Sequence, residues 1–282
     1  DETTLAGESA QTGRSHNRTL RPESTDFEKF MLTGWGEESS DIKPLDSSRY
    51  TPARLRALGR KFAGERLILP AGQPKVRNDD CDYAFRPDSA FAYYTGLGQD
   101  YEAGAILVLE PVLSGQSGKD AGTEETHSAT LYAHPRSDQT TSDYYRSAAY
   151  GEYWVGARPG LKGLETMTGI HTADIADFDD AVGRNVSASD GGIHVRIIRN
   201  ADPALTGQID AMRKKNGYAD ISAVLSDDDA LYQAASVQRM LKDPYEISEM
   251  RKAIAATKDG FSRMLSALPQ ALGSSRGERI LE

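Results

Sequence analysis

Three closely spaced aspartates, Asp79, Asp80 and Asp82, are the residues of this sequence best suited to chemistry. Carboxylates can act as a general base or as ligands of hard metal ions. Aspartates on a turn also cap backbone N–H groups or pair with a nearby arginine, and Arg86 follows them closely. These residues alone favour the structural role, and a catalytic role stays open.

The segment from Asp80 to Gly96 combines five aromatic residues, three acids and one arginine within seventeen residues. A surface loop has little use for so much aromatic area, and an apolar core excludes so many charges. We therefore expect a rigid wall whose polar tips face a ligand or a partner. A second candidate is Trp154, beside Tyr153 and Arg158, which suits either a core or interface anchor or the wall of a pocket.

The sequence does not support several other kinds of site. It contains no GxxxxGK[ST] motif, and its five histidines show no HxxxH or HExxH spacing. The lone cysteine, Cys81, excludes an internal disulfide and fits a reducing, cytoplasmic compartment. The net charge of −9 argues against non-specific binding to nucleic acid or to an anionic membrane.

The elements that must position these residues alternate between strands and helices. Apolar runs predict four strands, the middle two paired as a hairpin, at 67–69, 105–109, 130–133 and 194–198. Helical spacing predicts a helix capped by Thr51 and two further helices, over 170–183 and 204–215. This alternation indicates an α/β domain with a mixed sheet.

The last part of the chain has a different pattern. Asp243, Pro244 and Glu246 form a capping-box signature, after which apolar residues recur at helical spacing until Pro269. A second such signature, in which Ser275 would be the cap, begins only a few residues before the end. Because so short a helix is marginal by itself, we interpret the C-terminus as a cut inside an element.

Three segments resemble the N-terminal half of a Xaa-Pro aminopeptidase (aminopeptidase P), a metallopeptidase of the prolidase and creatinase family. Tyr83–Gly96 is similar to the family's aromatic-Arg-x-x-Ser-x-Phe-x-Tyr-x-Thr-Gly signature. Glu152–Arg158 is similar to its Trp-x-Gly-x-Arg segment, and Leu241–Ile247 is similar to the beginning of its catalytic domain. The first segment is long and fairly specific, and the other two gain weight from their order and spacing.

The resemblance implies a ribonuclease-H-like N-terminal domain with a mixed, six-stranded sheet over residues 48–235. An N-terminal arm, partly disordered or peripheral, would occupy residues 1–47. Residues 236–282 would be the first helices of a truncated "pita-bread" catalytic domain. In this family that domain binds two divalent metal ions, usually manganese, and their ligands would lie outside this chain.

The resemblance also implies roles for individual side chains in a homo-oligomer. Asp80 would pair with the free amino group of a peptide at the active site of another subunit, and Trp154 would line that pocket. Tyr83, Arg86 and Tyr94 would build the wall behind them.

The expected function is that of the N-terminal portion of a cytoplasmic enzyme that releases an N-terminal residue preceding proline. This portion would be inactive alone, and would supply oligomer contacts and part of the pocket rim. Its partners would be the remaining C-terminal catalytic portion, in the same or a separate chain, and a peptide with a penultimate proline. Two alternatives stay open, namely a prolidase or creatinase relative and a non-catalytic protein of this fold that binds peptides or proteins.

Overall fold

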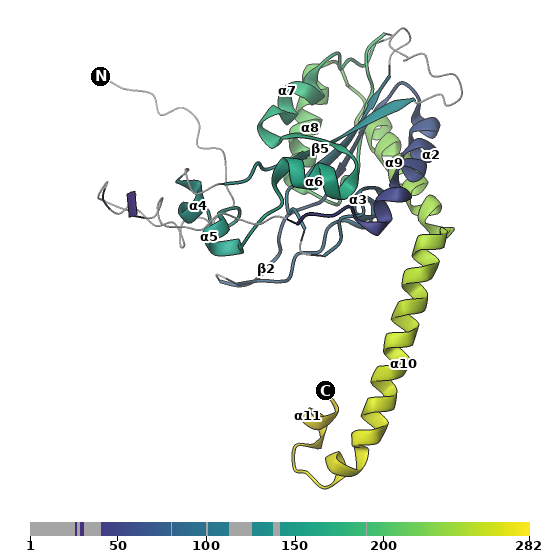
Figure 1. Ribbon diagram of the computed structural model, residues 1–282. Helices are drawn as coiled ribbons and strands as arrows, with labels where there is room; N and C mark the ends of the chain where they lie inside the picture. The colour runs from purple at the N-terminus through teal and green to yellow at the C-terminus, as the bar shows by residue number, and fades with distance from the viewer. Residues whose placement is uncertain are drawn as a thin grey trace. The chain divides into compact units, whose positions relative to one another are not determined.

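The computed structural model of the chain describes residues 41–79, 81–99, 101–112, 126–137, 142–189 and 191–282, together with Asp26, Lys29 and Phe30. The chain divides into two compact units, Asp1–Gln238 and Arg239–Glu282 (Figure 1). Most of the arm expected over residues 1–47 lies outside the described residues.

The first unit is built on a mixed sheet with the strand order β6-β5-β4-β1-β7. Strand β4 pairs antiparallel with β1 and β5, whereas β6 and β7 run parallel to their neighbours. The strands are β1 (Arg66–Pro70), β4 (Ile106–Pro111), β5 (His127–Ala133), β6 (His171–Asp174) and β7 (Val195–Ile197). The four predicted strands, the hairpin and the mixed sheet are confirmed. Within the described residues this sheet has five strands, where the resemblance implied six.

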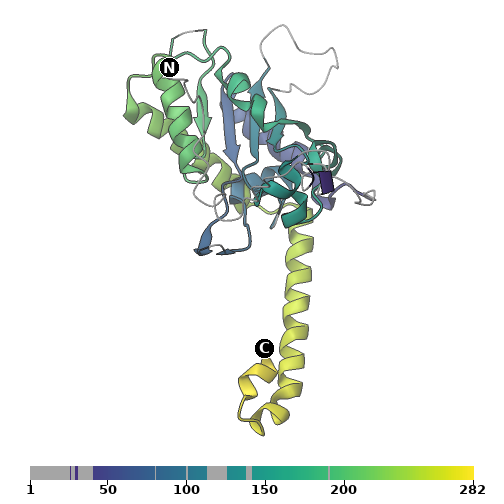
Figure 2. The same cartoon turned by 90° about the vertical axis from the view of Figure 1, so that its left-hand side faces the viewer.

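Helices cover both faces of this sheet (Figures 1 and 2). Neighbouring residues of β1 point to opposite faces, so Leu67 and Leu69 enter one apolar cluster and Ile68 enters the other. Side chains of α2 (Thr51–Gly59), α3 (Ser89–Thr95), α6 (Gly160–Thr168) and α9 (Ile221–Met240) fill the first cluster. Those of α7 (Phe178–Gly183) and α8 (Pro203–Lys215) fill the second. Burial on both faces explains why the central strands are apolar throughout.

Short elements connect these layers. Hairpin strands β2 (Val76–Asn78) and β3 (Cys81–Asp82) form a separate two-stranded sheet. The remaining elements of the first unit are η1 (Asp46–Arg49), η2 (Arg60–Phe62), α4 (Asp143–Arg146), α5 (Glu152–Val155) and η3 (Ile175–Asp177). Helix α2 begins at Thr51 as predicted, but Thr51 does not cap it, because its hydroxyl donates to the carbonyl of Ser48 at 3.3 Å.

The single helix predicted over residues 170–183 is wrong in its first part. His171–Asp174 forms β6, and helical structure begins only at Ile175. The backbone of β6 pairs with β5, with Thr172 opposite Leu131, so sheet hydrogen bonds at the edge override the helical spacing of the apolar residues. The Asp174 carboxylate then accepts from the Ala176 amide at 2.9 Å and starts the turn that leads into α7.

Two charged side chains cover the outer edge of β7. The Asp228 carboxylate of α9 accepts from the Ile197 amide at 2.9 Å, and the Arg213 guanidinium of α8 donates to the Val195 carbonyl at 2.6 Å. Arg213 and Asp228 also pair with each other at 2.6 Å, with side chains 2% and 0% exposed. This pair satisfies backbone groups that an uncovered edge strand would leave open.

The second unit contains α10 (Pro244–Leu272) and α11 (Gly277–Leu281). The capping box at the start of α10 is confirmed, since the Glu246 amide donates to Asp243 at 2.9 Å and the Asp243 amide donates to Glu246 at 3.1 Å. The helix does not stop at Pro269 as predicted, but continues through it to Leu272.

The second predicted capping box is wrong. Helix α11 follows Arg276, and no side chain caps its first turn. The Ser274 hydroxyl accepts from the Arg276 amide at 3.1 Å, so a local serine turn occupies the position where Ser275 was expected to cap.

Candidate functional site

The segment Tyr83–Gly96 contains helix α3, and each end of that helix has a local cause. The Asp88 carboxylate accepts from the Ala90 amide at 2.8 Å and caps its first turn. Gly96 ends the helix with a φ of 78°, a left-handed conformation that glycine adopts at little cost. Asp88 therefore has a structural role.

Of the three expected wall residues, Tyr94 lies in the core. Its ring is fully buried, and its hydroxyl donates to the Gln238 side chain at 3.1 Å. The neighbouring Tyr93 ring stacks under the Arg54 guanidinium at 4.2 Å, and that guanidinium also donates to the Tyr93 carbonyl at 2.7 Å. These contacts fix α3 against α2 and α9.

Tyr83 and Arg86 lie at the surface instead. Tyr83 is 60% exposed, and Arg86 is exposed as well. Both line a cavity of about 290 Å³ near the ends of β1 and β7, together with Lys75 and Asn200. Asp80, expected to contact the substrate, lies outside the described residues. The roles predicted for these residues stay predictions.

Trp154 is held at one end and exposed at the other. Its indole N–H donates to the Tyr145 carbonyl at 2.6 Å, yet 42% of the residue is exposed. Tyr153, next to it on α5, is 46% exposed and meets the indole edge-to-face at 5.3 Å. Within this chain Trp154 is therefore not a core residue, and its exposed face is available to a substrate or a partner.

Two ion pairs hold the segment around α5. The Glu152 side chain, 5% exposed, accepts from Arg136 at 2.6 and 3.0 Å and from the Arg158 amide at 3.3 Å. The Arg158 guanidinium, 11% exposed, donates to Glu102 at 2.7 Å and to the carbonyl of His134 at 3.2 Å. These ion pairs, in which Glu152, Arg158 and Glu102 are well buried, fix the backbone that carries Trp154.

An aromatic stack completes this support. The His134 ring lies 3.7 Å from the Tyr150 ring, and the Arg158 guanidinium lies 5.8 Å from Tyr150. Burial, and then the positive charge of Arg158, lower the pKa of His134 from 6.5 to about 4. His134 is therefore neutral at neutral pH. The sequence did not single out His134, Glu102 or Arg136 as site residues. The only signal in this region was the resemblance of the Glu152–Arg158 segment to the family.

The described residues do not form a metal centre. No group of three or more His, Cys, Asp or Glu side chains is placed to hold a metal ion in the part of the chain that the structure covers. Within the same residues, no helix is long and apolar enough to cross a membrane.

Comparison with known proteins identifies the family. Residues 52–194 match the family model described as "Aminopeptidase P, N-terminal domain". The chain belongs to the aminopeptidase P family. The matched range begins in α2 and ends just before β7, so it includes the segment Tyr83–Gly96 and Trp154.

Relatives of this family match more of the chain than the family model does. Xaa-Pro aminopeptidase 1 of Streptomyces coelicolor is 31% identical over 264 residues, which are 92% of this chain and 46% of that protein. Xaa-Pro aminopeptidase 2 of the same organism is 32% identical over 272 residues, 96% of this chain and 51% of that protein. The chain thus spans about half the length of the curated relatives it matches.

A solved structure supports the fold. A putative aminopeptidase P from Bacillus anthracis aligns with 77% of this chain and 46% of its own, with a TM-score of 0.55 and 21% sequence identity. The resemblance to an aminopeptidase P N-terminal half, made from three short segments, is confirmed by the family model and the relatives.

Proposed function

We propose that this chain is the N-terminal portion of a Xaa-Pro aminopeptidase, which releases an N-terminal residue that precedes proline. The match to two proteins named Xaa-Pro aminopeptidase over more than nine-tenths of the chain carries this proposal. We retain the division into an arm (1–47), an N-terminal domain (48–235) and the beginning of a catalytic domain (236–282). We also propose that the enzyme acts in the cytoplasm, as its single, exposed cysteine suggests.

The metal chemistry is proposed to reside outside this chain. The described residues offer no ligand set for the two divalent ions, so they do not fit the metal centre of the family. When bound, such ions activate a water molecule and polarise the scissile carbonyl. We assign no step of that chemistry to a residue of this chain, and we expect the chain alone to be inactive.

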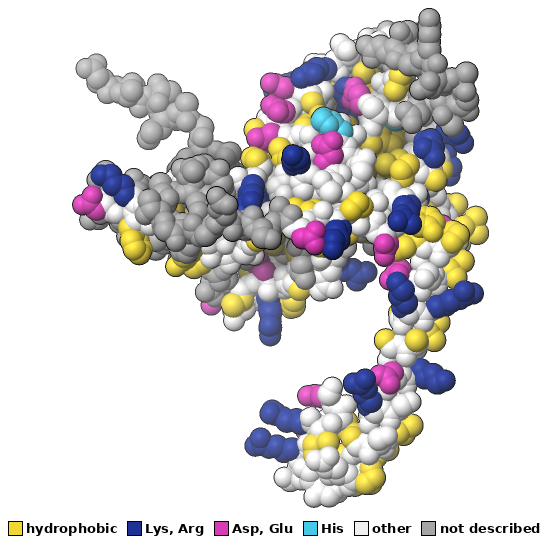
Figure 3. All heavy atoms as spheres, in the orientation of Figure 1, with side chains coloured by type: hydrophobic (Ala, Val, Ile, Leu, Met, Phe, Trp, Pro, Cys, Tyr) yellow, Lys and Arg dark blue, Asp and Glu magenta, His cyan; other side chains and the backbone are white. Residues whose placement is uncertain are grey.

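The α10 surface supports the need for a further catalytic portion. Phe261 is 58% exposed and Leu265 is 64% exposed, and Met250 and Ile254 are also more than half exposed. Figure 3 shows hydrophobic side chains along α10 between charged ones. A helix with such an apolar face is stable when another surface covers it. We propose that the remaining catalytic portion covers this face.

The proposed contribution of this chain is a wall of the substrate pocket in a neighbouring subunit of a homo-oligomer. Trp154 suits that role because hydrogen bonding fixes its indole while part of its face stays exposed. The ion pairs of Glu152 and Arg158 hold the backbone on both sides of it. Asp80 is proposed to pair with the free amino group of the substrate, as its position in the segment suggests.

The test compares two samples. One is the 282-residue chain alone, and the other, the longer form, is this chain together with the proposed catalytic portion, in one polypeptide or as two chains. With manganese present, the longer form is expected to hydrolyse a peptide with proline at the second position and to spare one with alanine there. The 282-residue chain alone should hydrolyse neither. Trp154→Ala should lower kcat/KM by about tenfold or more, whereas Tyr232→Ala, an exposed aromatic on α9, should leave it unchanged.

Other outcomes would select the alternatives. Saturable peptide binding without turnover would favour a non-catalytic binder, and cleavage restricted to dipeptides would favour a prolidase-like enzyme. Turnover by the 282-residue chain alone would refute the proposed division of labour.

A further inference from the structure

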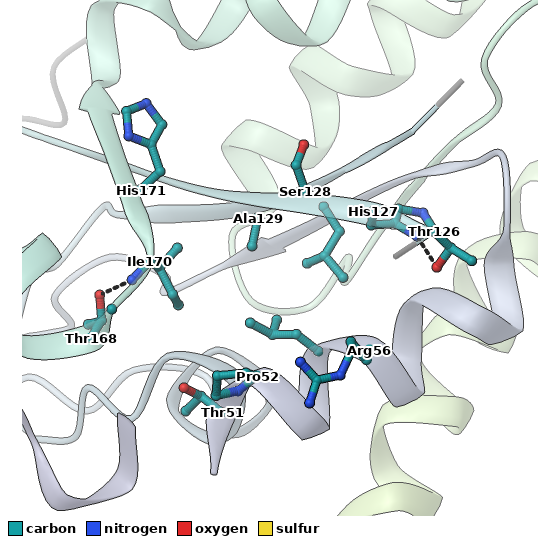
Figure 4. Close-up of a pocket in the computed structure, with 13 residues that line it drawn as sticks. Thr51, Pro52, Arg56, Thr126, His127, Ser128, Ala129, Thr168, Ile170 and His171 are labelled. Atoms are coloured by element: carbon teal, nitrogen blue, oxygen red, sulfur yellow. Dashed lines mark hydrogen bonds between the residues drawn. The ribbon is translucent and has the colours of Figure 1, made fainter. Parts of the chain in front are cut away.

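A second cavity, of about 300 Å³, lies between α2 and the edge of the sheet formed by β5 and β6. Figure 4 shows α2 on one side and the two strands on the other, with Ala129 pointing from β5 toward the helix. Leu55, Leu109 and Ile170 are among the lining residues, and the last two are almost fully buried. This volume is at the lower end of the range for small-molecule sites.

Arg56 is the cation of this cavity. Its side chain is half-buried, and Figure 4 shows it on the side of α2 that faces β5. Within the described residues, no hydrogen bond, ion pair or aromatic contact involves its guanidinium. By contrast, the more deeply buried Arg54 and Arg66 both donate to oxygen atoms of other residues. A half-buried guanidinium without an anionic partner among the described residues favours a ligand that supplies one.

The other lining residues bring no competing negative charge. Among the described residues that line the cavity there is no aspartate or glutamate, although the chain has 42 acidic residues and a net charge of −9. Burial lowers the pKa of His127, so that ring is neutral at neutral pH. Its Nε2 lies 2.7 Å from the Glu65 carbonyl and its Nδ1 lies 3.0 Å from the Thr126 hydroxyl, so both ring nitrogens are already engaged. The His127 ring therefore forms part of the cavity wall, and Arg56 supplies its positive charge.

The wall beside His127 is closely packed. A Cβ on Gly59 would lie 2.7 Å from the His127 Nδ1, so a larger residue there would displace the His127 ring. Opposite it, Thr168 is buried and its hydroxyl bonds to the Leu164 carbonyl at 2.7 Å and to the Ile170 amide at 3.1 Å. Both ends of the cavity are thus set by packed residues with satisfied polar groups.

We propose that this cavity binds a single carboxylate that carries a short apolar group. The carboxylate would take two N–H donors of the Arg56 guanidinium, and the apolar group would pack on Leu55, Leu109, Ala129 and Ile170. A free amino acid fits poorly, because the described lining residues include no acid that could receive its ammonium group. Two sources share the required chemistry, a free short-chain fatty acid and the C-terminal residue of a peptide. The proposal is independent of the proposed peptidase function.

The test is an NMR titration of the chain with labelled methyl groups. Isovalerate represents the free acid and N-acetyl-leucine represents a peptide C-terminus; leucine and isoamyl alcohol are the controls. Saturable shifts of the Leu55 and Ile170 methyls are expected with one or both carboxylates. Stronger binding of N-acetyl-leucine would assign the site to a peptide end, and stronger binding of isovalerate would assign it to a free acid.

Three variants test the geometry. Arg56→Gln is expected to weaken binding by about tenfold or more. Arg60→Gln, which changes an exposed arginine outside the lining, is expected to leave it within about twofold. Ala129→Leu fills the cavity, so it should abolish binding while Arg56 remains. Their far-UV circular dichroism and urea midpoints establish that each variant is folded.

Several results would overturn the proposal. These are the absence of saturable shifts with both carboxylates, equal weakening by Arg56→Gln and Arg60→Gln, or binding of leucine as strong as that of isovalerate. None of these measurements involves peptide hydrolysis, so the carboxylate-binding proposal can fail while the proposed peptidase function holds, and the reverse.

Discussion

Replacing Asp228 by alanine is expected to be among the most destabilising single changes in the first unit. The Asp228 side chain is fully buried and accepts four hydrogen bonds from three of the described residues. Arg213 donates at 2.6 and 2.9 Å, Arg199 donates at 2.8 Å, and the Ile197 amide donates at 2.9 Å. One carboxylate thus joins α9 to α8 and to the outer edge of β7.

The magnitude follows from what alanine would leave behind. Arg213, only 2% exposed, would keep its charge without its main partner, and breaking a buried pair in this way costs about 3–5 kcal/mol. The Ile197 amide would also lose its acceptor, which adds about 1–3 kcal/mol where water cannot replace it. Asp210, 3.0 Å from Arg213, compensates in part. We therefore expect a loss of about 3 kcal/mol, a large share of the stability of an ordinary domain.

The assay is urea unfolding of the 282-residue chain, followed by tryptophan fluorescence, because Trp154 lies in the first unit. The midpoint should fall while the dependence on urea concentration stays the same. Asp228→Asn keeps an acceptor for the Ile197 amide and should lose less than alanine does. Asp229→Ala, at an exposed neighbouring position, should change the free energy of unfolding by less than about 0.5 kcal/mol.

A double substitution distinguishes the loss of the whole ion pair from the loss of one of its two charges. Arg213→Met combined with Asp228→Leu removes both charges, so it should destabilise less than Asp228→Ala alone. If Asp228→Ala and Asp229→Ala unfold at the same urea concentration, the reasoning about a buried pair at this edge is wrong.

Three further predictions concern other parts of the first unit. The pKa of His134 is about 4 in the folded chain, below its ordinary value of 6.5. As pH falls from 6.5 to 4, the unfolded chain therefore binds a proton at His134 that the folded chain does not, so the free energy of unfolding should decrease. His134→Gln should reduce that loss by about 1–2 kcal/mol after solvent screening, measured from the urea midpoints of both proteins between pH 6.5 and pH 4. Gly72→Ala should lower stability by about 2 kcal/mol or more, measured by the same unfolding assay, since Gly72 has a φ of +91° and a Cβ would lie 2.6 Å from the Ala201 carbonyl oxygen. Glu152→Gln should raise the KM of the longer, active form for a Xaa-Pro peptide more than it changes kcat, because Glu152 holds the segment around Trp154; an unchanged KM would contradict that role.

Local patterns predicted the elements whose causes are local. The runs at 67–69 and 105–109 are apolar because both faces of the central strands are buried, so they could be recognised without knowing their partners. The capping box of Asp243 and Glu246 closes within one helical turn, and it forms as predicted. The predictions were wrong where the spacing of apolar residues gave no sign of a competing interaction. Residues 171–174 became a strand because β5 offered them hydrogen-bond partners.

The long-range ion pairs, including those that support the candidate site, could not be predicted in the same way. Arg158 pairs with Glu102, 56 positions earlier, and Arg66 pairs with Glu110, 44 positions later. No periodicity connects such residues, because the fold alone brings them together. Arg158 could be selected from the resemblance of its segment, but its partner could not, since an acid at position 102 looks like any other surface acid.

This difference bears on the two interpretations of Trp154. From the sequence, a large aromatic next to a tyrosine and an arginine suited a core, an interface or a pocket. The structure removes the core interpretation within this chain, because 42% of the residue is exposed while its N–H is bound to the Tyr145 carbonyl. Because buried, paired residues hold the adjacent exposed faces of Tyr153 and Trp154 in place, these faces form a pre-organised aromatic surface that suits binding. The ion pairs below it, more than the tryptophan itself, therefore support the proposal that this segment serves a partner subunit or a substrate.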